Sequence, residues 1–121
     1  MSAASSGRPL QVVILGDWLP FPHGMATTSR VRLFARALLE AGVGVRVLSL
    51  QAVDRPPHIE NTMVRGEYMG IPFEYACGTT VRRDSFVARR LIAARGWVLG
   101  ALRLVQLRRQ GLLDLVLLWF W

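Results

Sequence analysis

The first third of the chain alternates between apolar runs and a proline-rich polar stretch. Residues 10–15 form a short, nearly continuous apolar run that ends at Gly16. Such a run is typical of a strand buried on both faces. Residues 16–24 hold two prolines and two glycines, so this stretch is expected to be a loop.

A helical pattern follows the loop. Apolar side chains recur at steps of three and four residues from Val31 to Ala41, which predicts an amphipathic helix. We expect the hydroxyls of Thr27, Thr28 and Ser29 to cap its N-terminus. We expect Gly42 or Gly44 to end the helix, and the valine-rich residues 43–50 to form a second strand.

The remainder of the chain predicts a loop, a strand, a helix and a last strand. Residues 51–65 show little periodicity, so we expect a loop there. Residues 67–76 predict a third strand, broken or bulged at Gly70 and Pro72. Residues 85–110 are helical in pattern and residues 112–121 predict a fourth strand. Five apolar residues of the helix fall near one face, which Arg95 interrupts and Gly96 and Gly100 weaken: Val87, Leu91, Val98, Leu102 and Val105.

This order of elements predicts an α/β fold. Strands that alternate with helices imply a Rossmann-like open parallel sheet of three or four strands with flanking helices and the first strand central. The small, polar residues 1–9 read as a flexible leader, and residues 10–121 as one partial domain. The last strand is apolar up to Trp121, so we expect it to need a neighbour or a covering helix.

Composition narrows the class of protein. The chain has 121 residues, of which 52 % are hydrophobic and 19 % charged, which excludes a wholly disordered chain. The single cysteine, Cys77, cannot form an internal disulfide, which fits a reducing cytosol. We expect neither a secretory signal nor a transmembrane helix, because the apolar runs are too short or carry arginine.

The net charge of +7 comes from one segment. Residues 82–109 hold eight arginines and one acid, and the chain has no lysine. Three readings stay open for this segment: an anionic membrane surface, contacted by Arg82, Arg83, Arg89 and Arg90; nucleic acid; or a crossover helix with a solvated arginine face. No nucleic-acid-binding module accompanies the arginines, so we do not expect a nucleic-acid partner.

The loop after the first strand is the candidate site, because ligands of open parallel sheets bind at the carboxyl ends of the strands. Gly24, Thr27, Thr28 and Arg30 would suit a phosphate group at the start of the helix. Alternatively, Gly24 is only a turn residue and the hydroxyls only cap the helix. Asp17, Trp18 and His23 of the same loop are candidate ligand contacts, although Asp17 could instead stabilise a turn and His23 could simply be exposed.

Some site classes are not expected. The loop has neither the glycine fingerprint of dinucleotide-binding proteins nor the Gly-Lys-Ser/Thr of a P-loop. One cysteine and two distant histidines do not make a metal-ligand set, so we expect no metal.

Two tracts of the sequence resemble a known enzyme family. Leu-Pro-Phe-Pro-His-Gly-Met-Ala-Thr-Thr-Ser-Arg (19–30), the helix after it, Glu40-Ala41-Gly42 and the valine-rich strand resemble the start of glycosyltransferase family 4, the retaining GT-B enzymes. Residues 66–82 are similar to a branch that acts on bacterial surface polysaccharides. The resemblance covers roughly residues 11–121.

The resemblance implies transfer of a sugar from a nucleotide-sugar to a glycan or lipid-linked acceptor. The N-terminal domain of such enzymes mainly holds the acceptor, and its first glycine-containing loop approaches the donor diphosphate. That loop matches Gly24 and its neighbours Met25, Thr27, Thr28 and Arg30 here. The resemblance also makes Asp17, Trp18 and His23 possible contacts of the acceptor. The resemblance implies no cofactor beyond the nucleotide-sugar, and a cytoplasmic protein that works there or at the inner face of the membrane.

The sequence departs from the family in what it lacks. It contains neither the nucleotide-binding domain nor the paired glutamates, and His23 and His58 do not occupy the position of the family's N-domain histidine. We therefore expect an incomplete GT-B N-terminal domain with no catalytic residues of its own, inactive without a C-terminal domain or partner chain. The alternative is a stand-alone, non-catalytic protein that docks on a partner or an anionic membrane through residues 82–109.

Overall fold

In the computed structural model, strands and helices follow one another in the predicted order, with one strand more than expected. The structure describes residues 9–17, 19–52, 54, 59, 61–82 and 85–119. The predicted leader lies outside these residues except for Pro9. The elements are β1 (Gln11–Gly16), α2 (Ala26–Glu40), β2 (Gly44–Ser49), β3 (Arg65–Tyr68), β4 (Ile71–Tyr75), α3 (Phe86–Arg109) and β5 (Leu115–Trp119).

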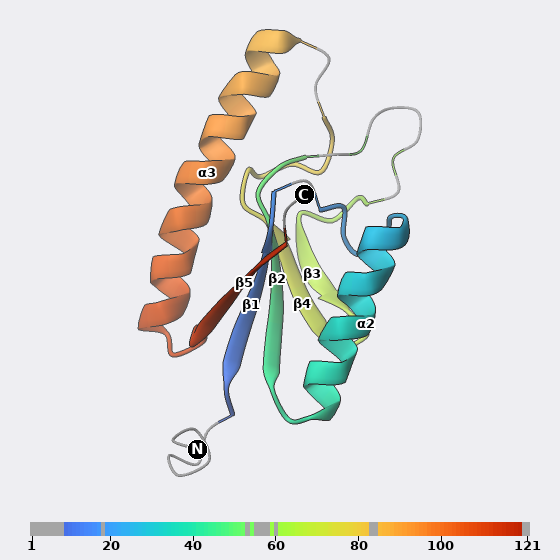
Figure 1. Ribbon diagram of the computed structural model, residues 1–121. Helices are drawn as coiled ribbons and strands as arrows, with labels where there is room; N and C mark the ends of the chain where they lie inside the picture. The colour runs from blue at the N-terminus through green and yellow to red at the C-terminus, as the bar shows by residue number, and fades with distance from the viewer. Residues whose placement is uncertain are drawn as a thin grey trace.

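The strands form one open sheet in the order β3-β4-β2-β1-β5 (Figure 1). Four of them are parallel, with Ile14 of β1 opposite both Val47 of β2 and Leu117 of β5, whereas β3 is antiparallel at the edge. The α/β class and the mostly parallel open sheet are confirmed, and the arrangement is compatible with a Rossmann-like fold. β1 is an interior strand, but β2 holds the middle position.

The prediction of a single third strand is wrong: residues 65–75 form a hairpin of two strands. The chain turns at Met69 and Gly70, whose φ angles are 50° and 83°. Two positive φ angles in a two-residue turn match the twist of the flanking strands. Pro72 is tolerated in β4 because pairing with β2 begins one residue later, at Phe73.

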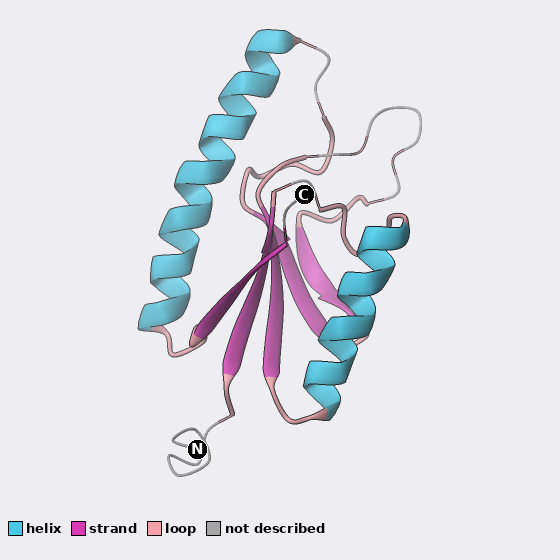
Figure 2. Cartoon of the chain, in the orientation of Figure 1, coloured by secondary structure: helices cyan, strands magenta, loops and turns pink. Residues whose placement is uncertain are grey.

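The two helices cover opposite faces of the sheet (Figure 2). Side chains of β1 alternate between these faces: Ile14 packs with Val31 and Ala35 of α2, whereas Val13 and Leu15 pack with Leu107 of α3. The near-continuous apolar run of β1 is therefore explained by a helix on each side.

Helix α3 packs on the sheet through two glycines and Leu107, whereas several of its large apolar residues are exposed. Gly96, Gly100 and Leu107 are its buried residues, and a Cβ on Gly96 would overlap the carbonyl oxygen of Leu50. The five apolar residues that the periodicity places near one face point away from the sheet. Their exposed fractions lie between 50 % and 67 %: Val87, Leu91, Val98, Leu102 and Val105.

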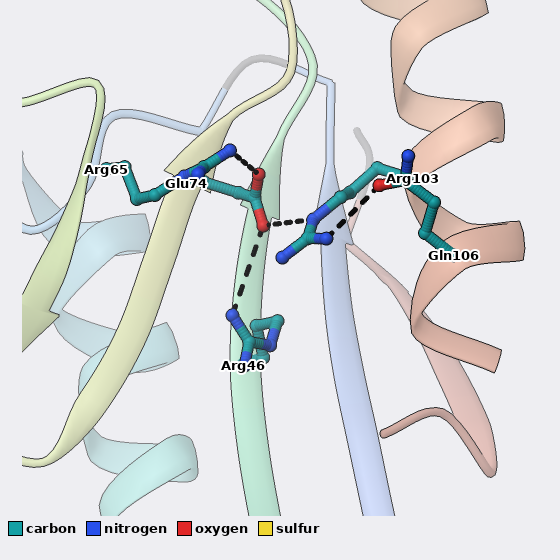
Figure 3. A network of polar contacts seen from close by, with 5 residues as sticks. All are labelled: Arg46, Arg65, Glu74, Arg103 and Gln106. Atoms are coloured by element: carbon teal, nitrogen blue, oxygen red, sulfur yellow. Dashed lines mark hydrogen bonds and ion pairs between the residues drawn. The ribbon is translucent and has the colours of Figure 1, made fainter. Parts of the chain in front are cut away.

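An ion-pair cluster also ties α3 to the sheet (Figure 3). The side chain of Glu74 on β4 is only 5 % exposed and lies among three arginines. Its Oε1 is 2.7 Å from Nε of Arg103 on α3 and 4.0 Å from Nη1 of Arg46, and its Oε2 is 3.3 Å from Nη2 of Arg65. Arg103 therefore faces the sheet and not solvent.

None of the helices in the described part of the chain has both the length and the apolar character to cross a membrane.

Candidate functional site

The loop that joins β1 to α2, residues 17–25, lies at the carboxyl edge of the parallel strands. The N-terminus of α2 lies at this same edge (Figure 1). Because parallel strands all end on one side, the segments that follow β2 and β4 lie on this side too. This is the edge at which open α/β sheets bind ligands.

Tyr75, the last residue of β4, anchors the loop at Phe21. The Tyr75 hydroxyl accepts a hydrogen bond from the Phe21 N–H and donates one to the Phe21 carbonyl, both 2.9 Å long. Both residues are buried. Burial raises the pKa of Tyr75, so the phenol keeps the proton that it donates.

Asn61 anchors the loop two residues further on. Its side-chain amide donates to the His23 carbonyl and accepts from the His23 N–H, each at 2.8 Å. Asn61 is buried, and its own N–H donates to Oδ2 of Asp54 at 2.7 Å. Tyr75, Asn61 and Asp54 are site residues that sequence reasoning missed, since no local pattern connects them to the loop.

Thr28 closes the loop from the side of α2. The residue is buried, and its hydroxyl donates to the Pro20 carbonyl at 2.7 Å. A Cβ on Gly24 would overlap the Thr28 hydroxyl and lie 2.9 Å from Cγ of Pro20. Close packing inside the loop therefore explains the glycine at position 24 without any bound ligand.

The prediction of a hydroxyl cap on α2 is wrong. The N-cap residue is Met25, which has no hydroxyl, and no side chain caps the helix, because Thr27, Thr28 and Ser29 lie inside the helix rather than at the N-cap position. No acidic residue lies in the first turn, and Arg30 is exposed there. Uncapped N–H groups at the positive end of a helix favour an anionic ligand.

The three candidate acceptor contacts, Asp17, Trp18 and His23, differ in their burial and in their neighbours. Asp17 is half-buried, and its Oδ1 is buried without a hydrogen-bond partner among the described residues. Trp18 lies outside the described residues. His23 is exposed, its ring packs edge-on against Tyr68 at 5.5 Å between centroids, and it borders a cavity of about 140 Å³ also lined by Asn61 and Glu67.

The four candidate membrane-contacting arginines lie at the start of α3 and just before it. Arg90 is exposed, whereas Arg82 and Arg89 are half-buried, and Arg83 lies outside the described residues. Three other arginines of α3 are also exposed: Arg95, Arg108 and Arg109.

Within the described part of the chain, no three histidine, cysteine, aspartate or glutamate side chains are grouped so as to hold a metal ion. The expectation of a metal-free protein stays a prediction. Comparison of the chain with protein-family models, with curated proteins and with solved structures found no match.

Proposed function

We propose that this chain is the acceptor-side, N-terminal part of a retaining GT-B glycosyltransferase, which moves a sugar from a nucleotide-sugar to a glycan or lipid-linked acceptor. The observation that carries the proposal is the uncapped N-terminus of α2 at the carboxyl edge of the sheet. The resemblance of residues 19–30 to the family's first loop supports it. The parallel sheet with a helix on each face is compatible with it.

In this proposal, different residues of the loop bind the donor and the acceptor. The first-turn N–H groups of α2, with Thr27 and Arg30, bind the donor diphosphate. Asp17 accepts a hydrogen bond from a hydroxyl of the acceptor, which would satisfy its buried, unpartnered oxygen. His23 and the cavity beside it receive another part of the acceptor. A nucleotide-binding domain, in a C-terminal region or a partner chain, supplies the rest of the active site.

Titration with pyrophosphate, followed by NMR of the ¹⁵N-labelled chain, tests the diphosphate part of this proposal. We expect the amide signals of Ala26, Thr27 and Thr28 to shift. Arg30→Gln should weaken binding about tenfold, the effect of one charge-assisted hydrogen bond. Arg109→Gln is the matched control, because it removes the same charge at the far end of α3.

Two results would contradict the diphosphate site. One is the absence of shifts at the start of α2. The other is an equal loss of affinity in Arg30→Gln and Arg109→Gln, which would mean that net charge alone attracts the anion.

The outward face of α3 favours a second candidate function, docking on an anionic membrane. Its large apolar residues extend from Val87 to Val105, a length of about 27 Å at 1.5 Å per residue. At 100° per residue, Arg95 projects on one side of this stripe and Arg90 and Arg108 on the other. Arg103 binds Glu74 on the sheet side, so it is not part of this outward surface. An apolar stripe flanked by arginine is typical of helices that lie in a membrane interface.

Co-sedimentation with vesicles tests this second function. We expect binding to vesicles that contain phosphatidylglycerol, little binding to phosphatidylcholine alone, and weakening by salt. Leu91→Ser should reduce binding, whereas Leu33→Ser should not, because Leu33 is equally apolar and exposed but lies on α2. Equal binding by both variants, or binding that salt does not change, would refute docking through α3.

A further inference from the structure

Strand β5 forms an open edge of the sheet. Within the described sheet it pairs with β1 on one side and with no strand on the other. Backbone N–H and C=O groups on the open side of an edge strand have no partner in the sheet. Another extended strand can pair with such a row of groups, whereas the backbone of a helix is already hydrogen-bonded within itself. The edge therefore favours a strand as its partner.

This edge lacks the features that usually keep edge strands from pairing. The sequence of β5 is Leu-Val-Leu-Leu-Trp, without a charged residue, a proline or a glycine. Charged side chains, prolines and short strands protect the edges of most sheets. The opposite edge strand, β3, is protected in this way, because it has only four residues and carries Arg65 and Glu67. Of the two edges, β5 is thus the one suited to pairing.

An apolar surface lies beside this edge, on the face of the sheet that α2 covers. Leu117 and Trp119 pack there against the core, and the Trp119 ring centre is 6.1 Å from that of Phe34 on α2. Leu115 lies on the same face, because side chains of a strand alternate between faces. Phe34 remains 40 % exposed and Leu115 48 % exposed. A partner that suits this edge must therefore bring apolar side chains as well as a strand.

We propose that a second copy of this chain occupies the edge, with the two β5 strands antiparallel about a two-fold axis. When Leu117 of one copy faces Leu117 of the other, all five residues of each strand are paired, over about 17 Å. This register places Leu115 opposite Trp119 of the second copy, and Val116 opposite Leu118. Both residues of each pair lie on the same face, so apolar side chains meet on both faces of the joined sheet.

The symmetry of this arrangement favours a second copy over an unrelated strand. About a two-fold axis the same surface serves on both sides, so the surface has only to be complementary to itself. Strand β5 meets this condition, because it carries no charge that would face a like charge. The pairing uses the open β5 edge of both copies, so assembly stops at a dimer. It uses neither the β1–α2 loop nor the outward stripe of α3, and it is independent of both functions proposed above.

Sedimentation equilibrium of the chain, from about 1 to 100 µM, tests the dimer. Five paired residues make a small interface, for which we expect a dissociation constant in the micromolar range. The mass should therefore rise from that of a monomer to that of a dimer. Because each copy has a net charge of +7, added salt should tighten the dimer by screening the repulsion. A chain that stays monomeric over this range, particles larger than a dimer, or a dimer that salt weakens would overturn the proposal.

Leu118→Lys, with Leu102→Lys as its control, tests where the two copies meet. Both leucines are exposed, by 65 % and 55 %, but Leu102 lies on α3. In the proposed register the two new lysines of a dimer are diagonal neighbours, about 7–8 Å apart, where like charges repel. We expect Leu118→Lys to raise the dissociation constant at least about tenfold and Leu102→Lys to leave it unchanged. Equal effects of the two variants would overturn pairing through β5.

Leu117→Cys tests the register of the pair. The two introduced thiols would face each other across the axis, with their Cβ atoms about 4.5–5.5 Å apart, near the distance that a disulfide needs. Mild oxidation should therefore link Leu117→Cys into a covalent dimer and leave Leu102→Cys unlinked, since the natural Cys77 is buried. A folded Leu117→Cys that does not link would overturn the antiparallel register. If Leu117→Cys unfolds the chain, the comparison of Leu118→Lys with Leu102→Lys still decides.

Discussion

Replacing Tyr75 with phenylalanine would test how the candidate site is held in place. The hydroxyl of Tyr75 makes two hydrogen bonds of 2.9 Å to the backbone of Phe21. Both residues are buried, so water cannot take over these bonds without opening the loop. The substitution removes one oxygen atom and leaves the ring that packs in the core beneath α2.

The magnitude follows from the groups that lose their partner. Each hydrogen bond contributes about 0.5–1.5 kcal/mol net, and a buried polar group left unsatisfied costs about 1–3 kcal/mol. With the N–H and the carbonyl of Phe21 both affected, Tyr75→Phe should lower the free energy of unfolding by about 2–4 kcal/mol. That is a large part of the ~5–15 kcal/mol of a typical domain.

The same hydroxyl should make stability depend on pH. Burial raises the pKa of Tyr75 in the folded protein above its ordinary value of 10.0. Below pH 10.0 both the folded and the unfolded chain keep the phenol proton, so the hydroxyl adds no pH dependence. Above that pH the unfolded chain loses the proton first, and stability falls as pH rises. Tyr75→Phe should remove this part of the alkaline loss.

Urea unfolding of wild type, Tyr75→Phe and Tyr68→Phe, at pH 7 and at several pH values above 10, measures both effects. Tyr68→Phe is the control, because Tyr68 packs by its ring against Phe21 and His23. A loss below about 1 kcal/mol at pH 7, together with an unchanged alkaline profile, would refute the role given to the hydroxyl.

The packing of α3 and its ion pairs give two further predictions. Gly96→Ala should lower stability by about 2 kcal/mol in spite of its higher helix propensity, since the new Cβ overlaps the backbone carbonyl of Leu50. Gly100→Ala should cost less, about 1 kcal/mol, because there the Cβ overlaps the end of the Leu50 side chain, which can shift, and not the backbone; equal losses in thermal unfolding would contradict this reasoning. Glu74→Gln should cost about 3 kcal/mol by leaving three arginines facing one another, whereas the exposed Glu67→Gln should cost little, and similar urea midpoints for both would argue against the cluster.

Elements with a local signal could be predicted from the sequence. The apolar run of β1 and the three-and-four spacing of α2 depend on neighbouring residues, so both were found within a few positions. The hairpin was not predicted, although a break at Gly70 was. Its pairing of Arg65 with Glu74 depends on a turn conformation that the residue types only suggest.

The sequence periodicity predicted an apolar face on α3, but it could not show that this face points away from the sheet. The face that packs on the sheet contains Gly96 and Gly100 beside Leu107, and a glycine adds no apolar side chain to a hydrophobic pattern. The anchors of the site were hidden for another reason. Asn61 and Tyr75 lie 38 and 54 residues from their partners in the loop, so only the fold brings them together.

The anchored β1–α2 loop has a consequence for the thermodynamics of binding. Fixing the backbone of one residue costs about 1–2 kcal/mol of conformational entropy. Hydrogen bonds from Ser49, Thr28, Tyr75 and Asn61 have already fixed the backbone between Leu19 and His23. A ligand that meets this loop therefore gains affinity from a surface ordered during folding. The amides of Phe21 and His23 should exchange with solvent as slowly as those of a strand, although they belong to a loop.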